Sequence, residues 1–338
     1  MTRRAVRIAT FAVATVVLAA CGNSSSPNML DPKGSEAKHI AGVWWLMFGL
    51  AAGVYLIVGG LIVHAILRGR RRARAEDASV DGPDSPRFDD RMIAYGGVVV
   101  PLVILFVIAV VTVRTTNALR RPATNPLRID VVGKRWWWDV TYPATHFTTA
   151  NAIHLPAGRP IEIRLTSDNV IHSFWVPQLA GKVDTIPGQT NLLRFTAPTP
   201  GTYEGECAEF CGIQHTHMGF VVVVQSEGDF GRWLAGHEKP ALEPASELAD
   251  EGQVAFDTLP CAGCHTIAGT PAQGTRGPAL TDIGARPTLG AGAAANDPAH
   301  LKQWIRDAPS LKPGVLMPPV AMTDAQARAI VAYLESLR

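Results

Sequence analysis

Charged side chains are scarce in this 338-residue chain: Asp, Glu, Lys and Arg make up only 18% of it, whereas hydrophobic residues make up 47%. A composition this apolar argues against an ordinary soluble protein and indicates that part of the chain lies in lipid. An extended basic surface is also lacking, because the net charge is only +2 and the arginines cluster beside apolar runs. These features argue against nucleic acid as a partner.

Cysteine is rare as well, and each of the five cysteines falls in a recognisable local pattern. At the N-terminus, an arginine-rich start and an uncharged apolar stretch too short to span a bilayer predict a signal peptide over residues 1–20. The sequence Leu18-Ala-Ala-Cys21-Gly resembles a bacterial lipoprotein cleavage site, so we expect a lipidated Cys21 followed by a flexible tether over residues 21–39. A free or disulfide-linked cysteine is the alternative.

Two long apolar runs, residues 40–67 and 92–113, each predict a transmembrane helix. Their length argues against helices buried in a soluble core. Arginines follow the first run directly, and by the positive-inside rule they place the loop over residues 68–91 in the cytoplasm. We therefore expect a bacterial inner-membrane protein that crosses the membrane twice and carries its C-terminal domains on the periplasmic, outer face.

Residues 120–235 contain short β-rich runs separated by Pro and Gly turns, which predict an all-β Greek-key domain. Within it, Cys207 and Cys211 are followed by His215 and Met218, and His172 lies on the edge of an earlier predicted strand. Thiolates, imidazoles and a thioether form a soft ligand set typical of copper, and two bridging sulfurs can hold two ions. A disulfide and a tetrahedral zinc site are the alternatives, although zinc rarely needs a thioether.

The segment from Cys207 to Met218 resembles the binuclear copper A loop of cytochrome c oxidase subunit II, and residues 167–177 and 182–188 resemble that family's upstream ligand segment. With the two spans, the resemblance covers residues 40–235. It implies a cupredoxin-like fold and a magnesium or manganese ion, shared with subunit I, facing the carboxylate of Glu209. The implied copper ligands are the backbone carbonyl of Glu209 and the side chains of His172, Cys207, Cys211, His215 and Met218.

An aromatic cluster at Trp136-Trp-Trp138 also resembles that family's, in which the first tryptophan receives electrons. The resemblance favours an electron-transfer role for Trp136, with packing as the alternative, and core or interface packing for Trp138. One departure concerns proton uptake: many relatives carry a glutamate near the position of Ala94, whereas the nearest carboxylates here are Asp89 and Asp90.

Residues 236–246, with two prolines, predict a linker, and residues 247–338 change to helix-forming sequence. Cys261-Ala-Gly-Cys264-His265 is the attachment pattern for haem c, with two thiols for the thioether bonds and an imidazole for the iron. A thioredoxin-like redox pair is the alternative. Met317, in a Pro-rich loop, matches the distal-ligand loop of small bacterial cytochromes c, whereas Met322 is expected to pack.

The order of lipid anchor, two spans, copper domain and haem domain resembles subunit II of caa3-type oxidases. The resemblance implies a multidomain membrane protein with a two-helix transmembrane hairpin, a cupredoxin-like domain and an all-α cytochrome c domain. It also implies electron input to subunit I, which reduces oxygen to water with proton translocation, and a neighbouring subunit III. The donor is expected to be an external cytochrome c or a cytochrome bc1 complex.

Three rival functions fit parts of the same sequence. A nitric oxide reductase could use the same electron carriers and differs only in its partner subunit. A membrane-tethered module that donates copper would need no haem, so the CXXCH motif argues against it. A quinol oxidase subunit is disfavoured because its relatives lack the copper ligands.

Overall fold

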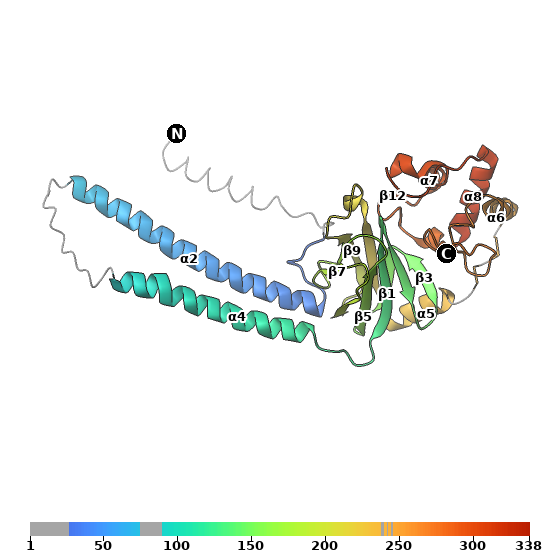
Figure 1. Ribbon diagram of the computed structural model, residues 1–338. Helices are drawn as coiled ribbons and strands as arrows, with labels where there is room; N and C mark the ends of the chain where they lie inside the picture. Colours follow the sequence, from blue (N-terminus) through green and yellow to red (C-terminus); the bar gives the residue numbers. More distant parts are fainter. Residues whose placement is uncertain (1–26, 75–89, 238–239, 242, 245) are drawn as a thin grey trace, which may run out of the picture.

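The computed structural model describes residues 27–74, 90–237, 240–241, 243–244 and 246–338, arranged as a helical hairpin, a β domain and a helical domain (Figure 1). The predicted signal peptide and the proposed lipidation site at Cys21 lie outside the described residues. So does Asp89, one of the two carboxylates near the second span.

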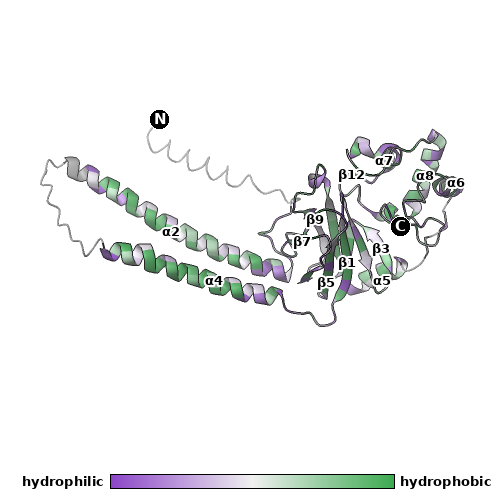
Figure 2. Cartoon of the chain, in the orientation of Figure 1, coloured by the Kyte–Doolittle hydropathy of each residue, from purple (hydrophilic) through white to green (hydrophobic). Residues whose placement is uncertain are grey.

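The helical hairpin consists of α2 (Ser35–Arg74) and, antiparallel to it, the π-helical η1 (Met92–Val99), which continues directly into α4 (Val100–Leu119). Both arms are long and apolar enough to cross a membrane, and the most apolar part of each is unburied in the chain alone. In Figure 2 most of both arms is coloured as hydrophobic, as expected of helices whose solvent is lipid. The two helices predicted from the apolar runs are therefore present, and each is long enough to cross a membrane.

Helix α2 begins inside the segment predicted to be a flexible tether, which corrects that boundary. Its first turn is fixed to the β domain, because the Glu36 carboxylate accepts a hydrogen bond from the Thr196 backbone N–H at 3.0 Å. Just before it, the Gly34 N–H donates to the Gln178 carbonyl at 2.9 Å. A Cβ at Gly34 would lie 2.0 Å from the Leu179 oxygen, so only glycine permits this approach. The hairpin is thus attached directly to the β domain.

The β domain is built from two five-stranded sheets. The first has the order β3-β2-β1-β5-β8 and the second β4-β10-β9-β6-β7. Pairs β1/β5 and β4/β10 are parallel and the others antiparallel. Strands such as β1 and β10 alternate buried and more exposed residues, as expected where one face covers a shared core. The strands are β1 (Leu127–Lys134), β2 (Trp137–Tyr142), β3 (Phe147–Ala150), β4 (Ala152–Pro156), β5 (Pro160–Ser167), β6 (His172–Trp175), β7 (Val183–Thr185), β8 (Asn191–Thr196), β9 (Gly201–Cys207) and β10 (Gly219–Gln225).

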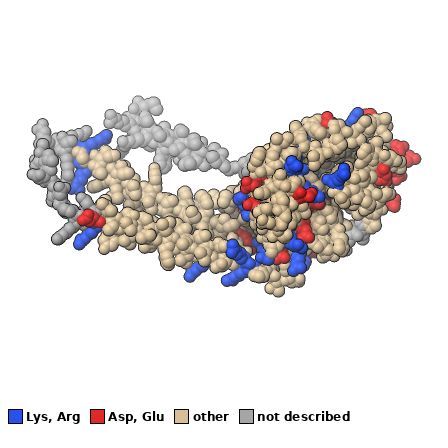
Figure 3. Space-filling view, in the orientation of Figure 1, with Lys and Arg blue, Asp and Glu red and all other residues tan. Residues whose placement is uncertain are grey.

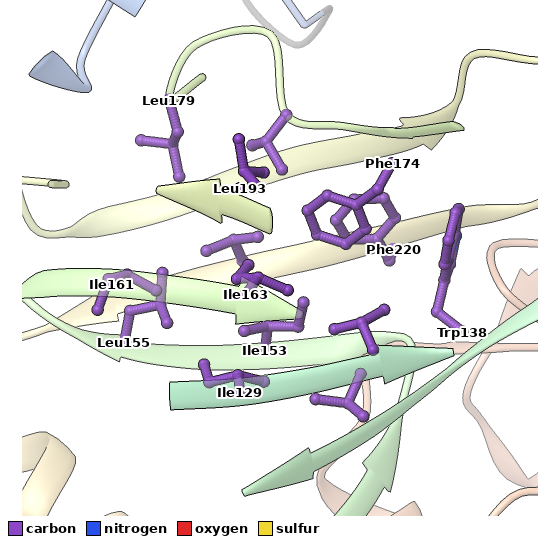
Figure 4. Close-up of a cluster of buried hydrophobic side chains, with 14 of the residues drawn as sticks. Ile129, Trp138, Ile153, Leu155, Ile161, Ile163, Phe174, Leu179, Leu193 and Phe220 are labelled. Carbon is purple, nitrogen blue, oxygen red and sulfur yellow. The ribbon is translucent and has the colours of Figure 1, made fainter. Parts of the chain in front are cut away.

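Among the core side chains drawn in Figure 4, the aromatic rings of Trp138, Phe174 and Phe220 lie together, beside a group of Ile and Leu side chains. The ring centroids of Phe174 and Phe220 lie 4.3 Å apart, and Trp138 meets Phe174 edge to face at 5.4 Å. The indole N–H of Trp138 donates to the Met218 carbonyl at 3.4 Å. Trp138 is fully buried, which confirms its predicted packing role, and it supports the loop that carries the predicted copper ligands.

Helix α5 (Glu227–His237) closes the β domain and was not predicted. It buries Phe230, and Trp233 stacks flat on His154 with ring centroids 4.1 Å apart. Because α5 ends at His237, the first residues of the predicted linker 236–246 belong to this helix. The sequence gives little helical signal here, since three glycines interrupt the segment.

The helical domain contains α6 (Glu247–Thr258), α7 (Pro298–Leu311) and α8 (Asp324–Ser336), with the short η3 (Ile283–Ala285), β11 (Thr288–Leu289) and β12 (Ala294–Ala295) between them. Thr323 and Gln326 form a capping box at the start of α8. Ile330 and Leu334 of α8 and the following Leu337 are buried together in the domain core. These helices surround the loops that carry the CXXCH motif and Met317.

Candidate copper and haem sites

The candidate copper ligands converge from two segments at one end of the second sheet. Strand β6 begins at His172, and the neighbouring β9 ends at Cys207. The loop after β9 carries Cys211, passes through the 3-10 turn η2 (His215–His217) and returns through Met218 into β10. The Ala208 N–H donates to the Ser173 carbonyl at 2.9 Å, which holds the loop against β6. Pairing of adjacent strands thus brings residues distant in sequence to one point.

Two sulfur atoms lie at the centre of this cluster. The Sγ atoms of Cys207 and Cys211 are 3.8 Å apart. His172 Nδ1 lies 3.9 Å from the Cys207 sulfur, and His215 Nδ1 lies 3.8 Å from the Cys211 sulfur. Met218 Sδ is 3.8 Å from the Cys211 sulfur. Each thiol therefore faces the other thiol and one imidazole.

The geometry discriminates between the alternatives raised by the sequence. A disulfide requires sulfurs about 2.05 Å apart, so a separation of 3.8 Å is that of two free thiols. Side-chain donors from two cysteines, two histidines and a methionine exceed the four ligands of a structural zinc ion. Soft sulfur and imidazole donors in this number fit a pair of copper ions bridged by the two thiolates.

The protonation of the two thiols is coupled. Hydrogen bonding with Cys211, followed by the contact with His172, lowers the pKa of Cys207 to about 3 against the cost of burial. The same hydrogen bond, together with burial, raises the pKa of Cys211. Two bare thiolates this close repel each other, and cations placed between them would relieve that repulsion. Binding of a cation would therefore stabilise the doubly deprotonated form of the two cysteines.

Glu209 presents its two ends to different surroundings. Its backbone carbonyl lies 3.3 Å from the Cys207 sulfur, whereas its carboxylate lies 3.8 Å from the ammonium of Lys182. Lys182 also pairs with Asp184 at 3.5 Å, and Asp184 accepts a hydrogen bond from Ser173. The carbonyl thus faces the sulfur cluster while the carboxylate points away from it, toward other charged groups.

Trp136 lies between the sulfur cluster and the helical domain. Its indole N–H donates to the carbonyl of Cys211 at 2.9 Å, and the side chain is only 8% exposed. A Cβ at Gly212 would meet the indole ring at 3.0 Å, so the copper loop lies directly on the ring. On the other side of the ring, a Cβ at Gly314 would lie 3.6 Å from the nearest ring atom. The indole therefore contacts the loop that carries Cys211 and lies near Gly314, in the segment that leads to Met317.

The CXXCH motif folds as a turn after α6. The N–H groups of Cys264 and His265 both donate to the Cys261 carbonyl, at 3.1 and 3.0 Å. His265 Nδ1 bonds to the carbonyl of Pro278 at 2.8 Å, which leaves Nε2 as the free ring nitrogen. Burial lowers the pKa of His265, so the imidazole is neutral at pH 7, as an iron ligand must be. Both thiols are free. These residues fit covalent haem c.

The absence of a side chain at Gly277 makes room for the His265 ring, because a Cβ at this position would lie 2.5 Å from the ring carbon Cε1. We predict that Gly277→Ala displaces the imidazole, lowers haem incorporation and destabilises the domain by about 1–3 kcal/mol. A pyridine haemochrome assay and a thermal melt measure the two effects. Gly263→Ala, inside the motif itself, is the matched control, since its Cβ would meet only ordinary contact at 3.5 Å. Equal haem content in both variants would contradict this role for Gly277.

The two methionines after α7 occupy different environments. Met322 packs against the hydrophobic core of the helical domain, which confirms its predicted packing role. Met317 is half-buried in the loop that contacts Trp136, between exposed Leu316 and Pro318. As the sixth ligand of the haem iron, Met317 remains a prediction.

Comparisons with known proteins match both halves of the chain. Residues 144–226 match the family "Cytochrome C oxidase subunit II, periplasmic domain", and residues 249–338 match "Cytochrome c". Cytochrome c oxidase subunit 2 of Alkalihalophilus pseudofirmus is 32% identical over 334 residues, covering 96% of this chain and 94% of that one. The same subunit of Bacillus sp. strain PS3 is 31% identical, covering 71% and 72%. Quinol oxidase subunit 2 of Bacillus cereus is 29% identical, covering 66% and 75%.

Two apolar helices, a cupredoxin-like domain and a cytochrome c domain define a subunit of the haem–copper oxidase class. Because the match to the Alkalihalophilus protein extends over nearly the whole chain, the protein belongs to the cytochrome c oxidase subunit 2 family. Membership implies copper A in the β domain, haem c in the helical domain and assembly with subunit I.

Two features of the site carried no usable sequence signal. Lys312 and Gln214 both bond across the boundary between the β and helical domains, each to backbone carbonyls. A carbonyl acceptor is present at every residue, so no side-chain pattern could have revealed these bonds. The sequence shows only that Lys312 lies near Met317 and that Gln214 lies within the copper loop.

Proposed function

We propose that this chain accepts electrons on its outer face and delivers them to subunit I, where oxygen is reduced to water with proton translocation. The observation that carries the proposal is the pair of free sulfurs 3.8 Å apart, each facing an imidazole. When bound, a copper pair held by these residues would share one electron between two ions, and haem c would supply a one-electron carrier whose potential a methionine ligand would raise. The donor class would be an external cytochrome c or a cytochrome bc1 complex.

The proposed cofactor ligands fall into two groups, one in each extramembrane domain. Cys261 and Cys264 would hold haem c covalently, and His265 and Met317 would bind its iron. Six groups would hold the two coppers: the carbonyl of Glu209 and the side chains of His172, Cys207, Cys211, His215 and Met218. The outward carboxylate of Glu209 would face a magnesium or manganese ion at the boundary with subunit I.

Trp136 is proposed as the group that couples the two domains electronically, because its indole bonds to the Cys211 backbone and its carbonyl accepts a hydrogen bond from Lys312, in the segment that leads to Met317. We predict that Trp136→Ala slows electron transfer between the domains severalfold while the optical spectra of both centres stay unchanged. Trp136→Phe should fall between this variant and the wild type, since it keeps a ring but loses the N–H bond to Cys211. Laser-initiated reduction of the haem, followed at the copper band, measures the rate.

The Trp136→Ala variant also loses a buried ring, which typically costs about 3–5 kcal/mol of folding free energy. Copper and haem content must therefore be checked in each variant before rates are compared. A rate in Trp136→Ala equal to that of the wild type, with both centres loaded, would remove the indole from the route.

The proposed orientation places both C-terminal domains on the periplasmic side of a bacterial inner membrane. Arg68 and Arg70 lie at the end of the hairpin far from the β domain, and blue side chains mark that end in Figure 3. Lipidation of Cys21 would add a third attachment to the same membrane. Contact with subunit III is a proposal as well.

The test of the proposed function is rapid mixing of the purified oxidase complex with reduced cytochrome c. We expect haem c to be reduced first, the copper band next and oxygen to be consumed last. Copper that leaves for an apo-acceptor protein, without oxygen consumption, would instead support a metal-donating module. Turnover with nitric oxide but not oxygen would assign the chain to a reductase.

A further inference from the structure

Lys312 is a buried lysine at the boundary between the two extramembrane domains. It follows α7 directly, and its side chain is among the largest fully buried ones in the described chain, with a residue exposure of 1%. Its own carbonyl accepts the N–H of Val315 at 3.3 Å, so Lys312 begins the turn that leads to Met317. The residue thus connects the predicted haem-ligand loop to the surface of the β domain.

The ammonium of Lys312 is bonded to three carbonyl oxygens from three different segments. It donates to Trp136 at 2.8 Å and to His217 at 2.6 Å, both in the β domain. Its third bond goes to Gly290 in the helical domain, at 2.6 Å. An ammonium has three N–H donors, so all of them are used. Two of the three bonds cross the domain boundary, next to Trp136 and to the copper loop.

Placing a lysine here is costly, because its charge is removed from water. Burial lowers the pKa of Lys312 to about 7, only partly opposed by attraction to Cys211. A buried charge is tolerated only where hydrogen bonds replace its lost hydration, and removing one partner leaves the others unsatisfied. Charge-assisted bonds of this kind are directional, so they fix the position of one domain on the other more precisely than apolar contact does.

Other contacts hold the same boundary. Beside Lys312, the Gln214 amide donates to the Pro313 carbonyl at 2.8 Å. The Gly219 N–H, at the start of β10, donates to the Ala291 carbonyl at 3.0 Å. Farther away, the buried Thr149 hydroxyl donates to the Asp282 carboxylate at 2.6 Å. In Figure 1 the helical domain accordingly lies against the edge of the β domain. Lys312 is the one of these residues that bonds to both the Trp136 segment and the copper loop.

We propose that Lys312 is a positioning residue that fixes the cytochrome c domain to the copper domain. Electron transfer through Trp136 then takes place while the two domains stay docked, and the cytochrome c domain does not have to move to the copper domain before each transfer. The inference rests on the proposed function, since it gives that electron route its geometry. It adds that the helical domain is held in place rather than moving between an external donor and the copper site.

The first measurement is the rate of electron transfer from haem c to the copper centre in the intact oxidase complex, in solutions of increasing viscosity. In the wild type the rate should not depend on viscosity. In Lys312→Met two of the bonds across the boundary are lost while the other three remain, so the contact weakens and the domain should separate and rebind between transfers. We therefore expect a rate roughly tenfold lower, the factor for losing about one net hydrogen bond, which falls further as viscosity rises.

The second measurement does not depend on electron transfer. Hydrogen exchange at the Gly219 amide, which bonds across the boundary to Ala291, should be slow in the wild type. In Lys312→Met it should be roughly tenfold faster or more, while the amides of α8 stay protected. Lys302→Met is the matched control, because Lys302 lies on α7 of the same domain but pairs with the exposed Asp324. It should behave as the wild type in both measurements.

Should Lys312→Met fail to incorporate haem, Lys312→Gln keeps two N–H donors and should give intermediate values. Wild-type rates and wild-type exchange in the loaded Lys312 variants would overturn the inference and leave the proposed function standing. A viscosity-dependent rate in the wild type would also overturn it. Absence of any electron arriving at copper in the wild type would count against the proposed function itself.

Discussion

Replacing Cys211 with Ser is expected to abolish the binuclear copper centre and to lower electron delivery to subunit I by more than about 100-fold. The reason is geometric: the Cys211 sulfur lies within 3.8 Å of Cys207, His215 and Met218, so its removal takes away the donor that all three face. Loss of a partner that only supports a metal ligand already costs about 10–100-fold, and a bridging ligand should cost more. Oxygen uptake with reduced cytochrome c measures the effect.

The fold should survive this substitution, because Ser is close to Cys in volume and the aromatic core below the site is untouched. The haem c spectrum therefore serves as an internal control in the same sample. Thr185→Val is the matched variant, since Thr185 is fully buried in the strand beside His172 and its hydroxyl has no partner among the described residues. Copper binding and turnover in Cys211→Ser equal to those in Thr185→Val would contradict the ligand assignment.

Replacing Met317 with His is expected to give the second largest effect, on the reduction potential of the haem. Axial ligands set haem potentials over a span of roughly 0.8 V, and a thioether stabilises the reduced iron more than an imidazole does. We expect a potential lower by about 0.1 V or more, with slower reduction by an external donor. A spectroelectrochemical titration of the full chain measures the shift.

Met322→Leu provides the control for this prediction, because Met322 packs in the core of the same domain and a Leu of similar volume fits there. The copper potential should be unchanged in both variants. An unaltered haem potential in Met317→His would show that another group is the sixth ligand and would also weaken the proposed path through Trp136.

The sequence was sufficient for the local parts of this protein. The spans follow from apolar length, and the haem motif follows from adjacent residues. Most of the copper set lies within one loop, from Cys207 to Met218. His172 is distant in sequence and reaches that loop only through pairing of β6 with β9, so it was assigned by resemblance rather than by spacing.

The long-range parts could not be predicted, and each has a physical reason. Helix α2 begins early because Glu36 finds the Thr196 N–H in a strand far along the chain. Helix α5 has weak helical propensity and depends on packing of Trp233 against His154. Lys312 bonds only to carbonyls, which carry no side-chain signature. Tertiary contacts decide all three features.

Metal analysis and electron paramagnetic resonance of the full chain, matured with haem and loaded with copper in detergent, test the central claim most directly. We predict two copper ions for each haem c and a hyperfine pattern in which one unpaired electron is shared equally by both nuclei. A single copper ion per chain, or a bond joining the sulfurs of Cys207 and Cys211 in the loaded protein, would contradict the account.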